Sequence, residues 1–459
     1  MNDCDNVELN KCSSDPHPSF HITGGKGWIN DPNAPVFFNG LYHVFYQYHP
    51  YSTVWGPMHW GHAVSADLTH WQTLPIALFP GGDGDKDGCF SGTALVYNGK
   101  LYLMYTGFSE NGGGENIRQV QCLAESEDGV SFLKRGVVIG SEDLPEGYSP
   151  CDFRDPKLFE KDGVFYCIVA AKYKDGHGRL LSYRSDDLIK WTFMSDVLGF
   201  SSYGIMFECP DYIDDLGLIL CCDQLPPSGK GGCKNRHSAR YFTGKFDFSC
   251  GKFEVKSEGI VDYGFDYYAP QSFAGASDTV IAWLNMWDRN VPSAKYGFAG
   301  MLTVPRKIFV KEGVLYSSPI VEKVLTKTET GNEISDNASV AVLEIEAENL
   351  KEFSLELRSG KDCSTTVKLV GGEWVFDRSM SGEKIVGAEE DEDSLRGVRR
   401  MPWSGDKKTR ITVVMDRFSI EFFEGGKVMS NTVYPPFGAD GIRLCAVSDN
   451  LVYKRYDIE

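Results

Sequence analysis

The sequence has no apolar run that approaches the roughly 20 residues of a membrane-spanning helix, so no such helix is expected. It is also short of basic residues: 46 lysines and arginines stand against 64 aspartates and glutamates, which gives a formal net charge of −18. So acidic a chain binds nucleic acid and anionic membranes poorly, and neither is an expected partner. Charged residues make up only 24% of the 459 residues, which argues against long disordered regions.

Metal and cofactor motifs are missing as well. The nine histidines form no HxxxH or HExxH pattern, and no CxxC pair has the spacing of a zinc site. Residues 83–88 mimic the start of an EF-hand, but Ala94 stands where that loop needs a bidentate carboxylate. Residues 24–27 lack the Gly-Lys-Ser/Thr ending of a phosphate loop. We therefore expect no metal and no cofactor.

The first ten residues are acidic and polar and contain neither a basic segment nor an apolar one, so no signal peptide is predicted. The chain has 13 cysteines, an odd number that cannot all pair within one chain. We interpret them as reduced, mostly buried thiols of a cytoplasmic protein.

What the sequence does contain is an internal repeat of about sixty residues. Its unit is an apolar run, a turn dipeptide and a second apolar run, the pattern of a β-hairpin. The expected turns are Asn39-Gly40, Asn98-Gly99, Asp162-Gly163 and, more weakly, Asp214-Asp215 and Ser277-Asp278. Sixty residues hold about four strands of five or six residues. The pattern therefore predicts an all-β fold in which residues 1–320 form a five-bladed β-propeller.

The pattern changes near residue 320. Residues 321–334 are polar and charged and are interpreted as a linker, with room for a helical turn. Residues 335–459 then alternate between short strands and turns, about every 8–12 residues, which is typical of a β-sandwich.

The phase of the repeat also predicts a site. The first strand of each propeller blade lines the central channel, so residues at equal phase meet at one end of it. Seven or eight residues before the expected turns stand Asp31, Phe90, Ser91, Asp155, Glu208 and Gln271. Converging carboxylates resist joint ionisation, and at least one pKa must rise. This suits a general acid beside an ionised nucleophile, as in glycoside hydrolysis, whereas a cation site is the competing hypothesis.

Aromatic residues near these acids indicate a sugar ligand. Trp28 lies close to Asp31 in sequence, and Trp55 and Trp60 follow in a Gly-Pro segment. Their rings offer apolar faces to the C–H groups of a sugar. The side chains that could bind sugar hydroxyls, besides the acids, are Asn30, Gln47 and Arg154.

Taken together, these segments resemble glycoside hydrolase family 32, which includes invertases, fructan hydrolases and sucrose-6-phosphate hydrolases. The resemblance covers nearly the whole chain and is carried by residues 28–33 (Trp-Ile-Asn-Asp-Pro-Asn), 45–50, 55–62, 89–92 (Cys-Phe-Ser-Gly), 153–156 (Phe-Arg-Asp-Pro), 208–210 (Glu-Cys-Pro), 268–271 and 416–423. Two departures are visible: Ala34 stands where the family usually has glycine, and Phe418 where it usually has serine.

The resemblance implies a five-bladed propeller, a β-sandwich and a retaining hydrolase of terminal β-D-fructofuranosyl residues. By the same resemblance, Asp31 would be the nucleophile, Glu208 the acid/base and Asp155 a transition-state stabiliser. Glu208, as the resting acid, is expected to have a raised pKa, and retention requires its carboxyl group to lie about 5–5.5 Å from that of Asp31. The remaining residues of the fructose site would be Trp28, Asn30, Gln47, Trp55, Phe90, Ser91, Arg154 and Trp287.

The sequence does not determine the leaving group. Sucrose, sucrose 6-phosphate, inulin-type and levan-type fructans all present the same fructosyl end, and the balance of hydrolysis and fructosyl transfer stays open. Two alternatives outside the family also remain: another propeller glycosidase, such as an arabinan-cleaving enzyme, and a sugar-binding protein with an inactive site. The oligomeric state is not predicted.

Overall fold

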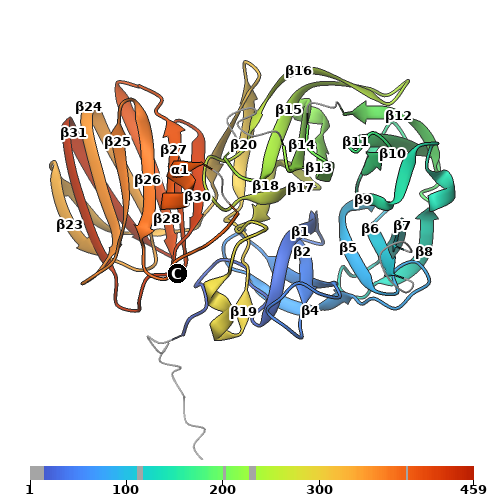
Figure 1. The fold of residues 1–459 in the computed structure, drawn as a ribbon, viewed down its shortest axis with the longest axis horizontal. Helices are drawn as coiled ribbons and strands as arrows, with labels where there is room; N and C mark the ends of the chain where they lie inside the picture. The colour runs from blue at the N-terminus through green and yellow to red at the C-terminus, as the bar shows by residue number, and fades with distance from the viewer. Residues whose placement is uncertain (1–14, 111–116, 200–202, 227–233, 389–390, 459) are drawn as a thin grey trace, which may run out of the picture.

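The computed structural model describes residues 15–110, 117–199, 203–226, 234–388 and 391–458. Its regular structure is almost entirely β-strand. A ring of small sheets lies beside a layered assembly of longer strands (Figure 1). Within the described residues, no helix is long and apolar enough to span a bilayer.

The ring is a five-bladed propeller, as predicted, and each blade is built on four consecutive antiparallel strands. The first two blades consist of β1 (Gly27–Phe38), β2 (Leu41–His49), β3 (His59–Ser65), β4 (Gln72–Leu78), β5 (Gly88–Tyr97), β6 (Lys100–Glu110), β7 (Ile117–Ser126) and β8 (Leu133–Ile139). The third and fourth consist of β9 (Tyr148–Lys161), β10 (Val164–Tyr173), β11 (Gly178–Ser185), β12 (Thr192–Leu198), β13 (Met206–Ile213), β14 (Leu218–Gln224), β15 (His237–Asp247) and β16 (Lys252–Ile260).

The fifth blade breaks the simple pattern, because a long loop interrupts it. Its strands are β17 (Tyr268–Phe273), β18 (Ala276–Trp283), β20 (Arg306–Lys311) and β21 (Val314–Pro319). Within the loop, β19 (Phe298–Ala299) pairs in parallel with β1 of the first blade. This pairing ties the last blade to the first. Short 3₁₀ helices lie at Ser141–Asp143, Asp214–Leu216 and Pro292–Tyr296.

The conformation of the hairpin turns explains why the repeat could be recognised from the sequence. Asn39 and Gly40 both have positive φ, 51° and 84°, which is the backbone of a type I′ turn. The turns at Asn98 and Asp162 have the same conformation. The fifth turn was placed wrongly: Phe273 pairs with Ala276, so the turn is Ala274-Gly275, whereas residues 277–278 lie inside β18. Gly275 supplies the required positive φ of 87°.

A β-bulge recurs at the same place in the inner strand of every blade. The ladder shifts register between Ile29 and Pro32, Cys89 and Gly92, Arg154 and Lys157, Glu208 and Asp211, and Tyr268 and Gln271. A bulge bends its strand and re-aims the side chains within it. Five equivalent bulges therefore present their side chains at the same end of the channel.

The bulges correct the equivalences expected from the sequence. The residue before the register shift is Ile29, Arg154, Glu208 or Tyr268 in four of the blades, so Asp155 lies one residue and Asp31 two residues beyond the position of Glu208. Gln271 lies on the far side of the fifth bulge, at the position of Asp211, and Tyr268 is the residue equivalent to Glu208. The error follows from the misplaced turn. A second irregularity in β1 gives Ala34 a φ of 47°, a conformation that glycine adopts most readily.

The C-terminal strands form the predicted β-sandwich, shown in orange and red in Figure 1. They are β22 (Val324–Thr330), β23 (Glu333–Asn337), β24 (Ala341–Ser359), β25 (Ser364–Val370), β26 (Glu373–Met380), β27 (Val398–Pro402), β28 (Lys408–Asp416), β29 (Ser419–Glu424), β30 (Lys427–Thr432) and β31 (Gly441–Asp457), with the short helix α1 (Glu392–Arg396). The long strands β24 and β31 pair with each other and join the layers. Trp374, Val413 and Leu444 are fully buried in the core.

The linker expected at residues 321–334 is mostly strand. β22 and β23 both pair with β31, and none of the described residues in this segment is helical. Most side chains of β22 are exposed, which is why the segment reads as polar. The backbone hydrogen-bonding groups of β22 pair with those of β31. This strand lies more than 100 residues away in the sequence, so the pairing cannot be inferred from the local sequence pattern.

A buried ion network joins the two domains. The imidazole of His21 contacts Asp416 through Nδ1 at 2.9 Å and Glu421 through Nε2 at 3.2 Å. Arg306 donates to Glu421 at 2.6 Å and to Asp262 at 3.0 Å. All of these charges are removed from water, so each depends on its partners.

Candidate active site

The three predicted carboxylates lie together around one thiol. Asp31 is in β1, Asp155 in β9 and Glu208 in β13, which are the inner strands of three blades. The Sγ of Cys209 lies 3.4 Å from Oδ2 of Asp31 and 3.6 Å from Oδ2 of Asp155. The backbone N–H of Cys209 also donates to Asp155 at 2.9 Å. Cys209 follows Glu208 directly, so all three acids meet at this point.

Asp31 accepts a side-chain hydrogen bond at one carboxylate oxygen and has no hydrogen-bond partner among the described residues at the other. Ser91 Oγ donates to Oδ2 of Asp31 at 2.7 Å, whereas Oδ1 is buried without a hydrogen-bond partner among the described residues. The residue is only 8% exposed. Burial, followed by the charge of Glu208, raises the pKa of Asp31 against the donors that stabilise its anion. An oxygen left free beside a fixed one suits a nucleophile.

Glu208 is clamped at both oxygens. Arg154 Nε donates to Oε1 at 3.0 Å, and the Tyr268 hydroxyl donates to Oε2 at 2.6 Å. Burial alone would raise the pKa of Glu208, but Arg154 and Tyr268 outweigh it and hold the pKa below its usual value. The expectation of a raised pKa at Glu208 is therefore wrong for the unliganded site. That expectation considered the neighbouring anions but not the hydrogen bond that the Tyr268 hydroxyl donates to Glu208.

The pKa of Asp155 is raised, like that of Asp31. Burial and the charge of Glu208 raise it to about 7, against the opposing effect of Arg154. The backbone of Asp155 sits in the bulge with a φ of 64°, and its N–H donates to Thr106 Oγ1 at 2.8 Å. Asp155 is therefore partly protonated near neutral pH.

Indole rings form one side of the site. Trp28 and Trp287 stack with ring centroids 6.0 Å apart, and Trp283 packs edge-on against both rings. Trp28 Nε1 donates to Asn30 Oδ1 at 2.8 Å, which fixes the amide beside Asp31. Trp28 and Asn30 therefore act as a unit next to the proposed nucleophile.

A second aromatic group comes from the first two blades. Trp55, which is 44% exposed, lies edge-on to Phe90, and Phe90 stacks on Phe108 with centroids 4.5 Å apart. Trp60, expected beside Trp55, is instead fully buried and donates to the Phe90 carbonyl from behind. It belongs to the hydrophobic core of the first two blades, where it packs with Phe45 and Tyr105.

Gln47 lies behind this group. It is almost fully buried, and its Nε2 donates to the carbonyl of Cys89 at 3.0 Å, which ties the first blade to the second. Its expected contact with a sugar hydroxyl stays a prediction.

Three residues of the site were missed by sequence reasoning. Tyr268 and Cys209 lie in the bulges, and Gln119 Oε1 accepts from Phe153 N at 2.9 Å and from Arg154 Nη1 at 3.4 Å. The correct fifth turn would have revealed Tyr268, because its bulge is equivalent to that of Glu208. No pattern in the sequence identifies Gln119, which reaches Arg154 from a neighbouring blade.

A cation site gains no support from this geometry. In the part of the chain that the structure describes, no three His, Cys, Asp or Glu side chains are arranged to hold a metal ion. The space between Asp31 and Asp155 is taken by a thiol whose pKa is raised by burial and neighbouring anions. The carboxylate of Glu208 is already paired with a cation, the guanidinium group of Arg154.

Comparison with known proteins agrees with this arrangement. Residues 21–319 match the N-terminal domain of glycosyl hydrolases family 32, and residues 313–458 match the C-terminal domain of that family. A sucrose-6-phosphate hydrolase of Zymomonas mobilis subsp. mobilis is 34% identical, over 97% of this chain and 92% of that protein. A raffinose invertase of Escherichia coli is also 34% identical, over 95% of this chain and 93% of that protein.

Solved structures show the same architecture. The sucrose-6-phosphate hydrolase from Lactobacillus gasseri superposes with a TM-score of 0.89 at 25% identity, covering 97% of this chain and 94% of that one. A β-fructofuranosidase from Bombyx mori gives a TM-score of 0.81 at 30% identity, covering 98% and 96%. The chain belongs to glycosyl hydrolase family 32, and it is a glycosidase.

Proposed function

We propose that this protein is a retaining β-fructofuranosidase, which hydrolyses the terminal β-D-fructofuranosyl residue of sucrose or a related fructoside. The observation that carries the proposal is the division of labour among three clustered carboxylates. Asp31 has one oxygen without a hydrogen-bond partner among the described residues, Glu208 is clamped by two donors, and burial and the charge of Glu208 raise the pKa of Asp155 to about 7. A retaining glycosidase needs one carboxylate that attacks and one that first donates and then accepts a proton.

In the first step, Asp31 Oδ1 attacks the anomeric carbon of the fructosyl unit and forms a covalent ester. The bond to the leaving oxygen breaks, and that oxygen takes a proton from Glu208. In the unliganded site Glu208 is an anion, but a bound sugar removes water from it, and burial raises its pKa. Asp155, whose pKa is raised to about 7, can supply that proton.

In the second step, Glu208 takes a proton from a water molecule, and the oxygen of the hydroxide formed attacks the anomeric carbon. The ester breaks and Asp31 is released as a carboxylate. Asp155 hydrogen-bonds the fructose hydroxyls throughout, and Arg154 holds Glu208 in position. The Trp28 and Trp55 groups supply apolar faces for the sugar ring.

The substrate class follows from the family and its relatives. The names of the similar proteins include sucrose-6-phosphate hydrolases, a raffinose invertase and a β-fructofuranosidase. We propose sucrose and sucrose 6-phosphate as the first substrates to compare, followed by short fructo-oligosaccharides and inulin.

The decisive experiment has two parts. Values of kcat/KM on those four substrates identify the leaving group, and an arabinan serves as the control for the competing glycosidase class. Proton NMR of the first product then gives its stereochemistry. Release of β-fructofuranose supports the retaining mechanism, whereas inversion, or no cleavage of any fructoside, would overturn it.

We also place the protein in the cytoplasm, acting on a small sugar without a nucleic-acid or membrane partner. The support is the state of its cysteines: all ten in the described residues have free thiols, and most are buried. The other three, Cys4, Cys12 and Cys233, lie outside the described residues.

A further inference from the structure

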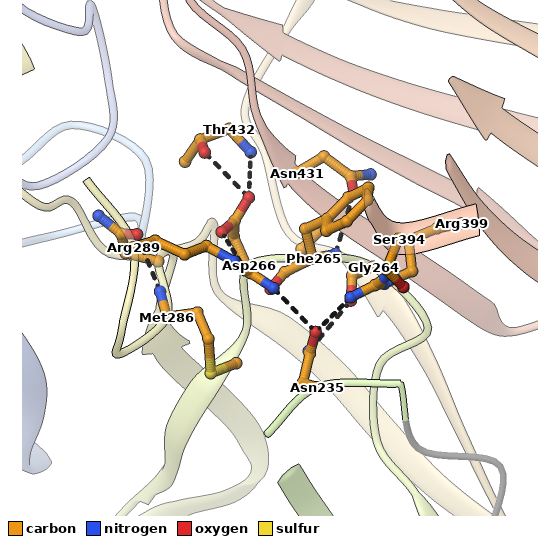
Figure 2. Close-up of polar contacts among 12 residues, drawn as sticks. Asn235, Gly264, Phe265, Asp266, Met286, Arg289, Ser394, Arg399, Asn431 and Thr432 are labelled. Carbon is orange, nitrogen blue, oxygen red and sulfur yellow. Dashed lines mark hydrogen bonds and ion pairs between the residues drawn. The ribbon is translucent and has the colours of Figure 1, made fainter. Parts of the chain in front are cut away.

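A buried aspartate lies where the propeller meets the sandwich. Asp266 is fully buried and immediately precedes Tyr267 and strand β17 of the fifth blade. Its Oδ2 accepts hydrogen bonds from the backbone N–H and hydroxyl of Thr432, at 2.8 and 2.9 Å, and from Arg378 at 2.7 Å. Its Oδ1 accepts from Arg289 at 2.9 Å. Figure 2 shows Asp266 between Thr432 of the sandwich and Arg289 of the propeller.

Positively charged side chains also pack on the ring of the neighbouring Phe265. The guanidinium groups of Arg378 and Arg399, in β26 and β27, lie 3.8 and 3.7 Å from the centre of its ring. Asn235 Oδ1 accepts from Arg399 at 2.6 Å and from Arg289 at 3.1 Å (Figure 2). Burial would raise the pKa of Asp266, but Arg378 and Arg289 hold it below its usual value. Asp266 is therefore a buried anion on which both Arg378 and Arg289 depend.

Two short stretches of chain connect this cluster to the active site. Tyr268 lies two residues after Asp266 and donates to Glu208 at 2.6 Å. Trp287 lies two residues before Arg289 and stacks on Trp28. Tyr268 and Trp287 thus lie two residues from Asp266 and from its partner Arg289, respectively.

The loop that carries Trp287 depends on contacts of this kind. Residues 284–288 are not part of a strand, so no sheet ladder fixes their position. Besides the ion pair of Arg289, the backbone of Asn290 donates to the Val386 carbonyl at 3.1 Å, and Asn290 Oδ1 accepts from Val386 N at 2.6 Å. Val386 belongs to the sandwich domain. The loop is therefore docked on the second domain through Asn290.

We propose that Asp266 is a positioning residue through which the sandwich domain sets the active site, with Tyr268 against Glu208 and Trp287 against Trp28. The proposal rests on the proposed function of that site. It assigns the second domain a role in the geometry of catalysis beyond holding the propeller closed. Because Asp266 contacts no substrate, its removal should change the position of the two aromatic residues and not the chemistry itself.

The test compares Asp266→Asn and Arg378→Met with a matched control, Asp262→Asn. Asp262 lies four residues earlier in the same segment, is equally buried, and also links the domains, through Arg306 and Ser430. Neither of those partners belongs to the active site. All variants are assayed at a temperature at which circular dichroism shows each to be folded, so that a loss of stability alone is excluded.

We expect Asp266→Asn and Arg378→Met to lower kcat/KM on the preferred fructoside at least about tenfold relative to Asp262→Asn, because displacement of catalytic groups by about 1 Å has effects of this size. The alkaline limb of the pH profile should move to higher pH, since a displaced Tyr268 no longer stabilises the Glu208 anion. Tryptophan emission should shift to the red as Trp287 gains solvent, and the shift should disappear in a Trp287→Phe background.

Thr432→Val keeps the shape of its side chain and removes one donor to Asp266, so it should give the same changes at smaller size without unfolding. The double variant Asp266→Asn with Arg378→Met should lose little more kcat/KM than either single variant, because both break one network. If Asp266→Asn only lowers the melting temperature, and its kcat/KM, pH limb and emission match those of Asp262→Asn, Asp266 is structural and the proposal fails. If the wild-type protein cleaves no fructoside, the proposed function fails, and the emission comparison still decides the positioning role.

Discussion

The hydroxyl of Tyr268 donates a 2.6 Å hydrogen bond to Glu208, at the oxygen that Arg154 does not hold. Tyr268 occupies the bulge of the fifth blade that is equivalent to the bulge of Glu208 in the fourth. The acid of the proposed mechanism is therefore set by two donors from two other blades. Its protonation depends on how these donors respond when a sugar enters.

Replacing Tyr268 with phenylalanine should raise the pKa of Glu208, because a hydrogen bond that stabilises the anion is lost. A hydrogen bond to a charged group contributes about 1.5–3 kcal/mol, so the alkaline limb of kcat/KM should move up by about one to two pH units. Tyr267→Phe is the matched control: the Tyr267 hydroxyl is buried without a hydrogen-bond partner among the described residues. An unchanged limb in Tyr268→Phe would show that this contact does not govern the acid.

The roles of the two proposed catalytic acids can be separated by substrate. Glu208→Gln should reduce sucrose cleavage by about 10²–10⁴-fold, yet spare more activity on a fructosyl fluoride, whose leaving group needs no protonation. Asp31→Asn should be inactive on both substrates, because no ester can form. Equal losses for Glu208→Gln on the two substrates, with the fold intact, would remove Glu208 from the acid role.

The stability of the protein should fall on the alkaline side through His21. Burial lowers the pKa of this imidazole, but Asp416 and Glu421 outweigh burial and raise it from 6.5 to about 9. A raised pKa means that the folded state binds the proton more tightly, so the contribution is complete below pH 6.5 and is lost as pH rises through 9. Melting temperatures from pH 6 to 9.5 should decline in the wild type.

The matched variant for this measurement is His21→Gln. It should be less stable than the wild type at pH 6, by about 3–5 kcal/mol if a buried ion network is broken. Its melting temperature should also be less sensitive to pH between 6.5 and 9. A wild-type profile parallel to that of His21→Gln would show that His21 is not charged in the fold.

Phe418, where the family usually has serine, should be a stability determinant. It is buried and packs on Tyr296 and Tyr434, with ring centroids 5.9 and 5.1 Å away. Phe418→Ser should cost about 3–5 kcal/mol, the range for truncating a buried aromatic side chain. Phe437→Ser, at an exposed ring that also faces Tyr296, should cost much less. Chemical denaturation measures both, and equal costs would contradict this account.

A thiol titration of the denatured, unreduced protein should find all 13 cysteines free. The ten in the described residues have free thiols, and burial raises the pKa of Cys167 and Cys221. A cytoplasmic protein retains such thiols. A deficit of four or more thiols would contradict both the redox state and the proposed location.

The sequence by itself determined the architecture and the identity of the three acids. Turn dipeptides such as Asn39-Gly40 need positive φ at both residues, so their spacing reports the blades directly. A propeller places residues of equal phase at equal depth in one channel. Counting from the turns therefore placed Asp31, Asp155 and Glu208 in the bulged segments of three inner strands, although the strand registers set them up to two residues apart.

Only the tertiary structure decided how those acids are charged and what holds them. The pKa of a buried carboxyl depends on every donor and charge within a few ångströms, and these come from separate blades: Tyr268 and Arg154 at Glu208, Ser91 at Asp31. For the same reason the sequence did not predict the strand at residues 324–330, because its partner β31 lies at the end of the chain. Local pattern reports the backbone conformation of a segment, whereas protonation and long-range pairing belong to the folded chain as a whole.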